Sequence, residues 1–482
     1  MTSELARLGG VLGCGGLAAL LVAGDRRIRI AGLAAWALGA LLLAIYLLPH
    51  GHRAILVAAA AAGLLLAAAA AAALRRWPWA LAIAALACFP ARVPVRVGST
   101  DANLLVPLYG VVAAGALALA WKLLRGDERA RELGPVAWPL AAFVAWTGLS
   151  IVWVDDLRQG AIELLFFVLP FGLLAVSLAR LPWSRRWLTF LYAQLALMAL
   201  AFGAIGVYQY ATRDVFWNPK VIVGNAYAPF FRVNSVFWDP SIYGRFLVVA
   251  ILASLVLVLA EKAAARAAVL ALAIAATWVG LLFSFSQSSF FALIAGVLVL
   301  AAFAWRWRAV VVGGLAAAVL VSVGFGAPNV RHSLLGHTRS SFDKVTSDRY
   351  SLVSNGLKIA VHHPVLGVGV GGFKRAYARQ THLRGQEPKK AASHNTPITV
   401  AAETGIPGIA LFAWLAAAAL LAAFRRIGWS FTGRTSLVAG LALGAILVHS
   451  LFYNAFLEDP MAWGLLALIA LVTALPREEA AA

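Results

Sequence analysis

Long apolar segments alternate with short polar connections along most of the 482-residue chain. A run of about 20 apolar residues is long enough to cross a bilayer as a helix. Segment 77–91 is short and flanked by prolines, so a re-entrant turn is an alternative there. The pattern predicts an all-α polytopic membrane protein with about 12–15 transmembrane helices, drawn from residues 5–23, 28–48, 54–74, 77–91, 103–122, 135–153, 161–179, 187–210, 238–260, 265–283, 288–305, 309–326, 396–422, 435–453 and 457–475.

The composition is that of a membrane protein, because 62% of the residues are hydrophobic and 12% are charged. Soluble domains carry about 25% charged residues. A net charge of +20 would suggest a nucleic-acid partner in a soluble protein, but loops that face anionic lipid account for much of it here. We therefore expect the lipid bilayer, and no nucleic acid, as a partner. Cys14 and Cys88 lie in apolar segments, where packing explains them better than a disulfide or a metal pair.

Lysine and arginine are concentrated in alternate loops. The positive-inside rule puts these loops in the cytoplasm; they are "GDRRIR", "LRRWPW", "KLLRGDERARE", "RLPWSRRW", "EKAAAR", "WRWR" and "FRRIGWSFTGR". Residues 212–237 and 327–395 then face outward, and the same parity puts the N-terminus outside. We expect a multi-pass protein of the cytoplasmic (inner) membrane with its active site on the extracytoplasmic side.

This topology divides the chain into four parts. Residues 1–211 hold N-terminal transmembrane helices, 212–326 hold central helices with an arginine-bearing outer loop, 327–395 form a large extracytoplasmic module, and 396–482 hold C-terminal helices. The module is basic, which indicates either a polyanionic ligand or a surface resting on anionic headgroups.

One helix is predicted inside the module, over "DRYSLVSNGLKIAVHHP". Its apolar positions Tyr350, Val353, Leu357 and Val361 share one face, and Pro364 follows its end. Such an amphipathic helix is expected to lie in the membrane interface rather than to span the bilayer.

Polar side chains in or beside the apolar segments are the candidate site residues. Arg232 precedes a span and Arg245 lies in its first turns. A buried intramembrane arginine usually marks a site, although snorkelling to the interface is an alternative for Arg245. In "SFSQSSFF", the side chains of Ser286, Gln287 and Ser288 would either bridge helices or line a polar cavity.

The stretch "SHNTPITVAAETGIPG" begins another span with His394 and Asn395 and carries Glu403 inside it. Ser393 or Asn395 would cap the helix, and the following Gly-Ile-Pro-Gly would kink it. Glu403 is nine residues past His394, on the opposite helical face, so we expect it to pair with a cation on another helix.

Motifs for metal or nucleotide chemistry are weak. "GVGVGG" does not follow a strand, so a tight, closely packed turn is the better interpretation than a dinucleotide site, although its amides could touch a phosphate. The adjacent acids Asp155–Asp156 and Glu458–Asp459 are interpreted as solvated loop residues. We expect no metal site and no cofactor.

The segment from Arg232 to about Pro460 resembles the O-antigen ligase and Wzy-type O-antigen polymerase superfamily. The resemblance rests on the order of "RVNSVFWDP", a polar S-x-S segment, "DRYSL…HHPVLGVGVGGF", "SHNTPITVAAETGIPG" and "HSLFYNAFLEDP". It implies an inverting, metal-independent glycan transfer from a polyprenyl-diphosphate carrier to a glycan or glycolipid acceptor.

The resemblance also implies the site. Carried over, His394 is the catalytic group and Arg232, with Arg349, binds the donor diphosphate. Family members usually have an arginine where this chain has Gln287. Another cation would replace it, and the candidates are Arg245, Arg339, Lys374 and Arg375, with Asn395, Glu403, Ser286 and Ser288 as supporting polar residues.

Elementary chemistry favours the same reaction. A diphosphate leaving group gathers negative charge that fixed arginines stabilise, and histidine is suited to take the proton of an incoming hydroxyl near neutral pH. Three functions stay open: a surface-polysaccharide polymerase, slightly favoured because Gln287 departs from the ligase pattern; an O-antigen or other envelope-glycan ligase; and a transporter or flippase of lipid-linked oligosaccharide.

Overall fold

The computed structural model of this chain describes residues 2–48, 53–97, 100–126, 133–227, 230–306, 308, 311, 313, 349–382, 393–454 and 456–475. The predicted span 309–326 and the candidate Arg339 lie outside the described residues. The division of the chain at residues 211, 326 and 395 stays a prediction.

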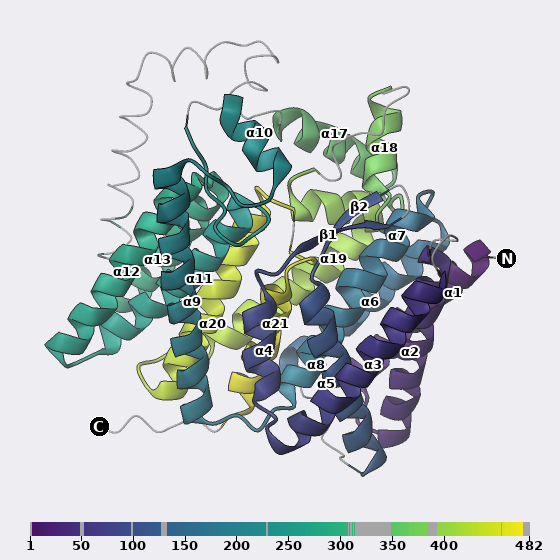
Figure 1. Ribbon diagram of the computed structural model, residues 1–482, viewed down its shortest axis with the longest axis horizontal. Helices are drawn as coiled ribbons and strands as arrows, with labels where there is room; N and C mark the ends of the chain where they lie inside the picture. Colours follow the sequence, from purple (N-terminus) through teal and green to yellow (C-terminus); the bar gives the residue numbers. More distant parts are fainter. Residues whose placement is uncertain are drawn as a thin grey trace.

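The described part is almost entirely helical, which confirms the predicted fold class (Figure 1). It contains 11 helices long and apolar enough to cross a membrane. The 15-residue apolar helix α21 (Pro460–Ala474) is shorter, and α3 (Arg53–Arg76) adds 24 residues of apolar helix. The candidate spans are α1 (Thr2–Val22), α2 (Arg26–Leu47), α5 (Val106–Leu124), α6 (Ala137–Leu149) with its 3-10 ends η1 (Gly134–Val136) and η2 (Ser150–Val152), α7 (Leu157–Glu163) with the π-turn η3 (Leu164–Val168) and α8 (Leu169–Ala179), α9 (Arg185–Thr212), α11 (Pro240–Ala260), α12 (Ala264–Ser284), α13 (Gln287–Trp305), α19 (Thr396–Phe424) and α20 (Phe431–Ser450).

The predicted span 77–91 is corrected by the structure. Only α4 (Ala80–Cys88), nine residues long, is helical there. The following residues form an antiparallel hairpin of β1 (Val93–Val97) and β2 (Thr100–Leu104), so the expected helix 103–122 begins later, at Val106. Alternating valines, which favour strands, start β1, and proline limits the preceding helix.

The loops predicted to be cytoplasmic gather at one end of the bundle (Figure 1). Arg26 donates to the carbonyl oxygens of Leu123 and Leu124, and the guanidinium of Arg75 lies 4.1 Å from the ring centre of Trp121. The other end carries the hairpin and three further helices: α10 (Pro219–Tyr227), α17 (Arg349–His362) and α18 (Phe373–Gln380). We call this second end the module end.

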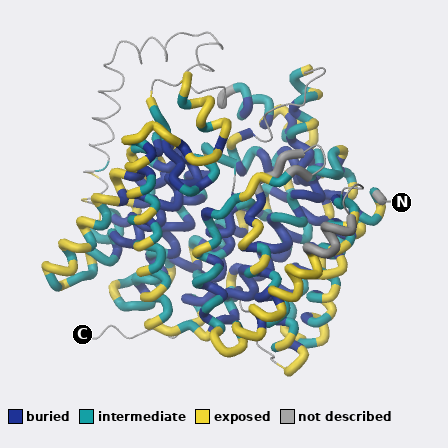
Figure 2. The backbone as a smooth tube through the Cα atoms, viewed as in Figure 1, coloured by how far each residue is buried: buried dark blue, intermediate teal, exposed yellow. Residues whose placement is uncertain are grey.

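Close packing of the first two helices shows why small residues recur in them. A Cβ added to Gly16 would lie 2.4 Å from the carbonyl oxygen of Gly32, and one added to Gly39 would lie 2.3 Å from the amide of Gly13. Glycines at this contact let the two backbones meet, as is common between helices in membranes. The most buried helices lie at the centre of the bundle, where α8, α11, α20 and α21 run (Figure 2).

Helix α19 is broken where the sequence predicts a kink. Gly405 has φ 69° and ψ −167°, a conformation that is essentially restricted to glycine. The freed backbone groups find partners in the segment before α18: the amides of Val368 and Gly369 donate to Ala402 and Glu403, and the amide of Ile406 donates to Pro364. The break therefore fastens the module to the bundle.

Gly405→Ala tests this attachment. The new Cβ would lie 2.5 Å from the carbonyl oxygen of Val365, and the backbone conformation is strained for alanine. We expect a loss of about 1–3 kcal/mol of stability and a lower midpoint of thermal unfolding in detergent. Gly110→Ala in α5, where a Cβ meets no atom within 4 Å, is the control and should not lower the midpoint. Equal midpoints for both variants would contradict the role of Gly405.

Candidate functional site

Several helix ends meet at the module end and bring polar side chains together. The N-termini of α11, α13, α19 and α21 lie there, with the C-termini of α12 and α20. Hydrogen bonds run between these ends from Arg232 to His449, and ring contacts continue the series through Tyr453 to His394; we call this series the polar track. Its successive members are Arg232, Ser284, Ser286, Ser288, His449, Tyr453 and His394.

Arg232 begins the polar track. The Asn225 side chain holds its backbone on both sides, accepting from the Arg232 amide and donating to its carbonyl oxygen, each at 2.9 Å. The Arg232 Nε donates to the carbonyl oxygen of Ser284 at 3.3 Å. The next residue, Val233, donates its amide to Phe283. The guanidinium is therefore fixed against the last turn of α12.

Buried serines link α12, α13 and α20. Ser286 Oγ lies 3.2 Å from Ser288 Oγ and 2.8 Å from Ser289 Oγ, and Ser288 Oγ lies 3.0 Å from His449 Nε2. The expected bridging of helices by these serines is confirmed. Gln287, which stands at the position of the family arginine, is exposed, whereas the serines on either side of it are buried.

Two histidines and a tyrosine complete the polar track. The ring centre of Tyr453 lies 5.6 Å from that of His449, which is buried, and 6.4 Å from that of His394, which is exposed. Burial raises the pKa of the Tyr453 phenol, and the carboxylate of Asp239 raises it further. Its hydroxyl therefore stays protonated at neutral pH.

Asn395 fixes the start of α19 beside the loop after α20. Its side chain accepts from the amide of Ile398 as the N-cap and donates to the carbonyl oxygen of Leu451 at 3.0 Å. The expectation of a cap at Ser393 or Asn395 is confirmed for Asn395. His394 itself has φ 58°, a left-handed conformation that few non-glycine residues adopt. Strained residues of this kind are concentrated at functional sites.

Arg245 lies inside the bundle rather than snorkelling. Its side chain is 3% exposed, and Nε pairs with Asp459 Oδ2 at 2.9 Å. The Arg245 Nη1 and Nη2 atoms are buried without a hydrogen-bond partner among the described residues. Unpaired buried donors of a charged group are costly.

Asp459 in the last loop is buried and structural rather than solvated, which corrects the sequence interpretation of that residue. Asp459 also caps α21 by accepting from the amide of Met461 at 3.0 Å. Arg92, which follows α4, donates to the carbonyl oxygen of Glu458 at 2.9 Å. Asp156 caps α7 by accepting from Gln159, while Asp155 pairs with Arg379 of α18.

Glu403 has a different partner from the one expected. The pairing with a cation on another helix is wrong for the described residues, because its carboxylate accepts from the backbone amides of Phe373, at 3.2 Å, and Gly371. It therefore holds the "GVGVGG" loop at the start of α18. The Val370 amide in that loop donates to Ser150 Oγ, so these amides are occupied rather than open to a phosphate.

The remaining candidate cations lie away from the polar track or at its edge. Arg375 donates to the carbonyl oxygen of Asp155 at 2.6 Å, which directs it toward the N-terminal helices. Lys374 precedes it on α18. Arg349 is the first residue of α17, and its side chain is outside the described part of the structure.

Three residues of this region did not emerge as site candidates from the sequence: His449, Tyr453 and Arg92. The motif "HSLFYNAFLEDP" contains the first two, but their partners are more than 50 residues away in the chain. Arg92 directly follows segment 77–91, which the sequence predicted as a span. For His449, the one signal in the sequence that could have marked it as a site residue was its place at the end of an apolar run.

Asp459→Asn separates the charge of Asp459 from its capping role. The amide can still cap α21, but Arg245 loses its counter-charge inside the protein. We expect a loss of about 3–5 kcal/mol in the free energy of unfolding, measured by denaturant in mixed micelles.

Two further variants control this measurement. Arg245→Met combined with Asp459→Asn should recover most of the loss, because no charge is then left buried. Glu261→Gln removes the partner of the exposed Arg266 and should change little. A small effect of Asp459→Asn alone would show that the pair is solvated.

Comparison with known proteins identifies one part of the chain. Residues 270–413 match the family model described as O-antigen ligase. This range includes the serines of α13, His394 and Glu403, whereas Arg232, Arg245 and His449 lie outside it. No curated protein matches the chain. This match supports the resemblance of the C-terminal half of the chain to the O-antigen ligase and Wzy-type superfamily.

Proposed function

We propose that this protein transfers a glycan from a polyprenyl-diphosphate carrier to a hydroxyl group of an acceptor glycan or glycolipid. The observation that carries the proposal is the polar track, which joins Arg232 to His394 through the ends of α12, α13, α20 and α19. Ionisable side chains in a bilayer protein are costly and by default mark a functional site. The match of residues 270–413 to the O-antigen ligase family model supports the same reaction.

In this proposal, Arg232 and Arg245 bind the diphosphate. As the bond between sugar and phosphate breaks, negative charge develops on the departing oxygen, and preorganised guanidinium groups stabilise it without reorganisation. The fixed position of Arg232 and the two unpaired nitrogens of Arg245 support these roles. We assign to Arg245 the role of the family arginine that Gln287 replaces.

His394 is proposed as the general base. It would take the proton of the acceptor hydroxyl while that oxygen attacks the anomeric carbon from the side opposite the diphosphate, which inverts the configuration. Its exposure leaves room for an acceptor, whereas His449 is buried against Ser288. Tyr453 lies between the two histidines as a neutral hydroxyl and positions the ring of His394.

The module end is proposed to face away from the cytoplasm, in the inner membrane. The concentration of basic loops at the opposite end supports this orientation. Helix α17 would lie in the interface, because Leu357 and Val361 are 55% and 66% exposed while Leu352 and Ile359 pack inward. A donor with a lipid tail could then enter from the bilayer. Arg349, at the start of α17, remains a proposed contact of the diphosphate, and Arg339 and Lys374 are secondary candidates.

Polymerase and ligase differ in the acceptor, and the departure at Gln287 slightly favours a polymerase. Purified protein incubated with lipid-linked repeat units would yield a ladder of products as a polymerase. A ligase would give a single transferred band with a separate acceptor. A flippase is disfavoured, because such transporters hold their polar site near the middle of the membrane.

His394→Ala and Arg232→Ala should each reduce transfer from a lipid-linked repeat unit. Loss of a general base costs about 10²–10⁴-fold, and loss of one charge-stabilising donor costs about 10²–10³-fold in kcat. Arg232→Lys should restore only part of the rate, since lysine lacks the guanidinium fork. The rate is measured by separating lipid-linked donor from product.

Arg266→Ala, at the basic end, is the matched control and should leave the rate unchanged. All variants are first compared by size-exclusion chromatography and thermal unfolding. Full activity of both site variants, at normal stability, would overturn the assigned roles.

Chelation tests whether arginines replace a metal ion in this reaction. We expect transfer to proceed unchanged in EDTA, because fixed guanidinium groups neutralise the diphosphate. If EDTA stops the reaction and Mg²⁺ or Mn²⁺ restores it, the arginine mechanism is wrong.

A further inference from the structure

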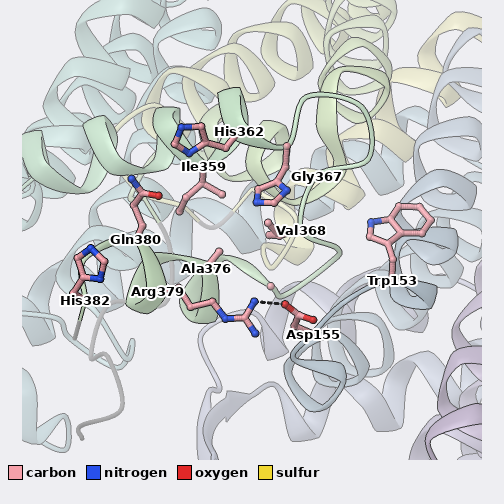
Figure 3. A pocket seen from close by; sticks show the side chains of 12 residues that line it. Trp153, Asp155, Ile359, His362, Gly367, Val368, Ala376, Arg379, Gln380 and His382 are labelled. Carbon is pink, nitrogen blue, oxygen red and sulfur yellow. Dashed lines mark hydrogen bonds and ion pairs between the residues drawn. The ribbon is translucent and has the colours of Figure 1, made fainter. Parts of the chain in front are cut away.

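A cavity lies at the module end, outside the polar track. It has a volume of about 410 Å³, and the loop after α6, the end of α17, the glycine loop and α18 surround it (Figure 3). None of its lining residues belongs to the polar track. Helix α17 connects the two: Gly356 packs against Ser393 and Ile398 at the start of α19, and His362 and His363 line the cavity.

An aromatic surface forms one wall of this cavity. The Trp153 Nε1 donates to the carbonyl oxygen of Leu366 at 3.1 Å, and the ring centre of Trp146 lies 5.9 Å away. Trp146 is itself fixed by donating to Thr404 at 2.8 Å. The indole of Trp153 is therefore held in place although it is only partly buried. The negative face of such a ring suits the weakly positive C–H groups of a sugar ring.

The facing wall is polar. Gln380 and His382 stand on the opposite side from Trp153 in Figure 3, and the ion pair of Arg379 with Asp155 lies between them. The amide of Gln380, the carboxylate of Asp155 and the guanidinium of Arg379 are planar and offer paired hydrogen-bond donors or acceptors. Pairs of this kind match the neighbouring hydroxyl groups of a sugar. The ion pair is exposed, so it contributes little to stability and is open to a ligand.

The charges of the cavity disfavour other ligands. Arg379 is matched by Asp155, so the guanidinium that lines the cavity is not left unpaired for a diphosphate. The polar wall does not suit a lipid chain, which needs apolar surface on every side. A volume of this size is typical of small-molecule sites.

We propose that this cavity is a glycan-binding subsite that stacks a neutral sugar residue on Trp153 and holds its hydroxyl groups through Asp155, Arg379 and Gln380. The inference rests on the proposed function for its substrate class. Helix α17 runs between this subsite and the start of α19. The subsite would therefore hold the sugar chain at the end of α17, while the reacting bond lies near His394. Its contribution is to affinity and to the length of glycan accepted, rather than to bond breaking.

The test measures binding of free repeat-unit oligosaccharide, released from the lipid-linked donor by mild acid, to the protein in nanodiscs by calorimetry. Trp153→Ala should weaken this binding about tenfold or more, because the fixed aromatic surface on which the sugar stacks is lost. In transfer assays the same variant should raise KM with little change in kcat. Trp153→Phe should retain most of the affinity.

Controls keep the subsite separate from the catalytic proposal. His394→Ala should bind free oligosaccharide like the wild type while losing transfer. Trp138→Ala, an exposed tryptophan of α6, should change neither. If Trp153→Ala unfolds, Gln380→Ala replaces it and should weaken binding about threefold or more.

Unchanged affinity and KM in Trp153→Ala and Gln380→Ala would overturn the subsite and leave the proposed function standing. Binding that depends on Trp153 in a protein without any transfer activity would support the subsite and overturn the proposed function.

Discussion

The interrupted hydrogen bonding of α19 is the constraint on which both the polar track and the cavity beside Trp153 depend. Three consecutive carbonyl groups, of Ala402, Glu403 and Thr404, accept from Val368, Gly369 and the Trp146 ring instead of from the next helical turn. Unpaired backbone groups inside a membrane protein cost several kcal/mol each, so these partners must be present for the break to exist. The break in α19, the "GVGVGG" loop and the contact of Trp146 with Thr404 therefore form together as one unit.

Glu403 extends this unit to α18. Its carboxylate accepts from the amides at the start of that helix, which fixes the direction in which α18 leaves the glycine loop. Arg375 and Arg379 then reach the 153–156 loop. A residue expected to pair with a cation on another helix thus holds backbone amides instead, and it sets the position of the cavity beside Trp153 relative to His394.

The polar track illustrates how an apolar bundle accommodates charge. Helix ends supply caps, since Asn395 and Asp459 satisfy the first amides of α19 and α21, while serines and His449 connect neighbouring helices. Arg245 is neutralised by Asp459 and still has two buried nitrogens without partners among the described residues. The polar track and its surroundings thus combine hydrogen-bonded groups that hold the geometry with the two Arg245 nitrogens, which have no such partner among the described residues.

The sequence by itself determined the fold class, the positions of most spans, the start and the kink of α19, and the concentration of cations near one end, because these depend on local periodicity, capping and glycine conformation. The span predicted at 77–91 was too long and the β1–β2 hairpin was not predicted, since a short apolar run fits either a helix or a strand. Only the tertiary structure decided that Arg245 pairs with Asp459, that Glu403 binds backbone, and that His449 meets Ser288. Periodicity gives the face a residue occupies, but the neighbour across that face depends on how helices far apart in the chain pack.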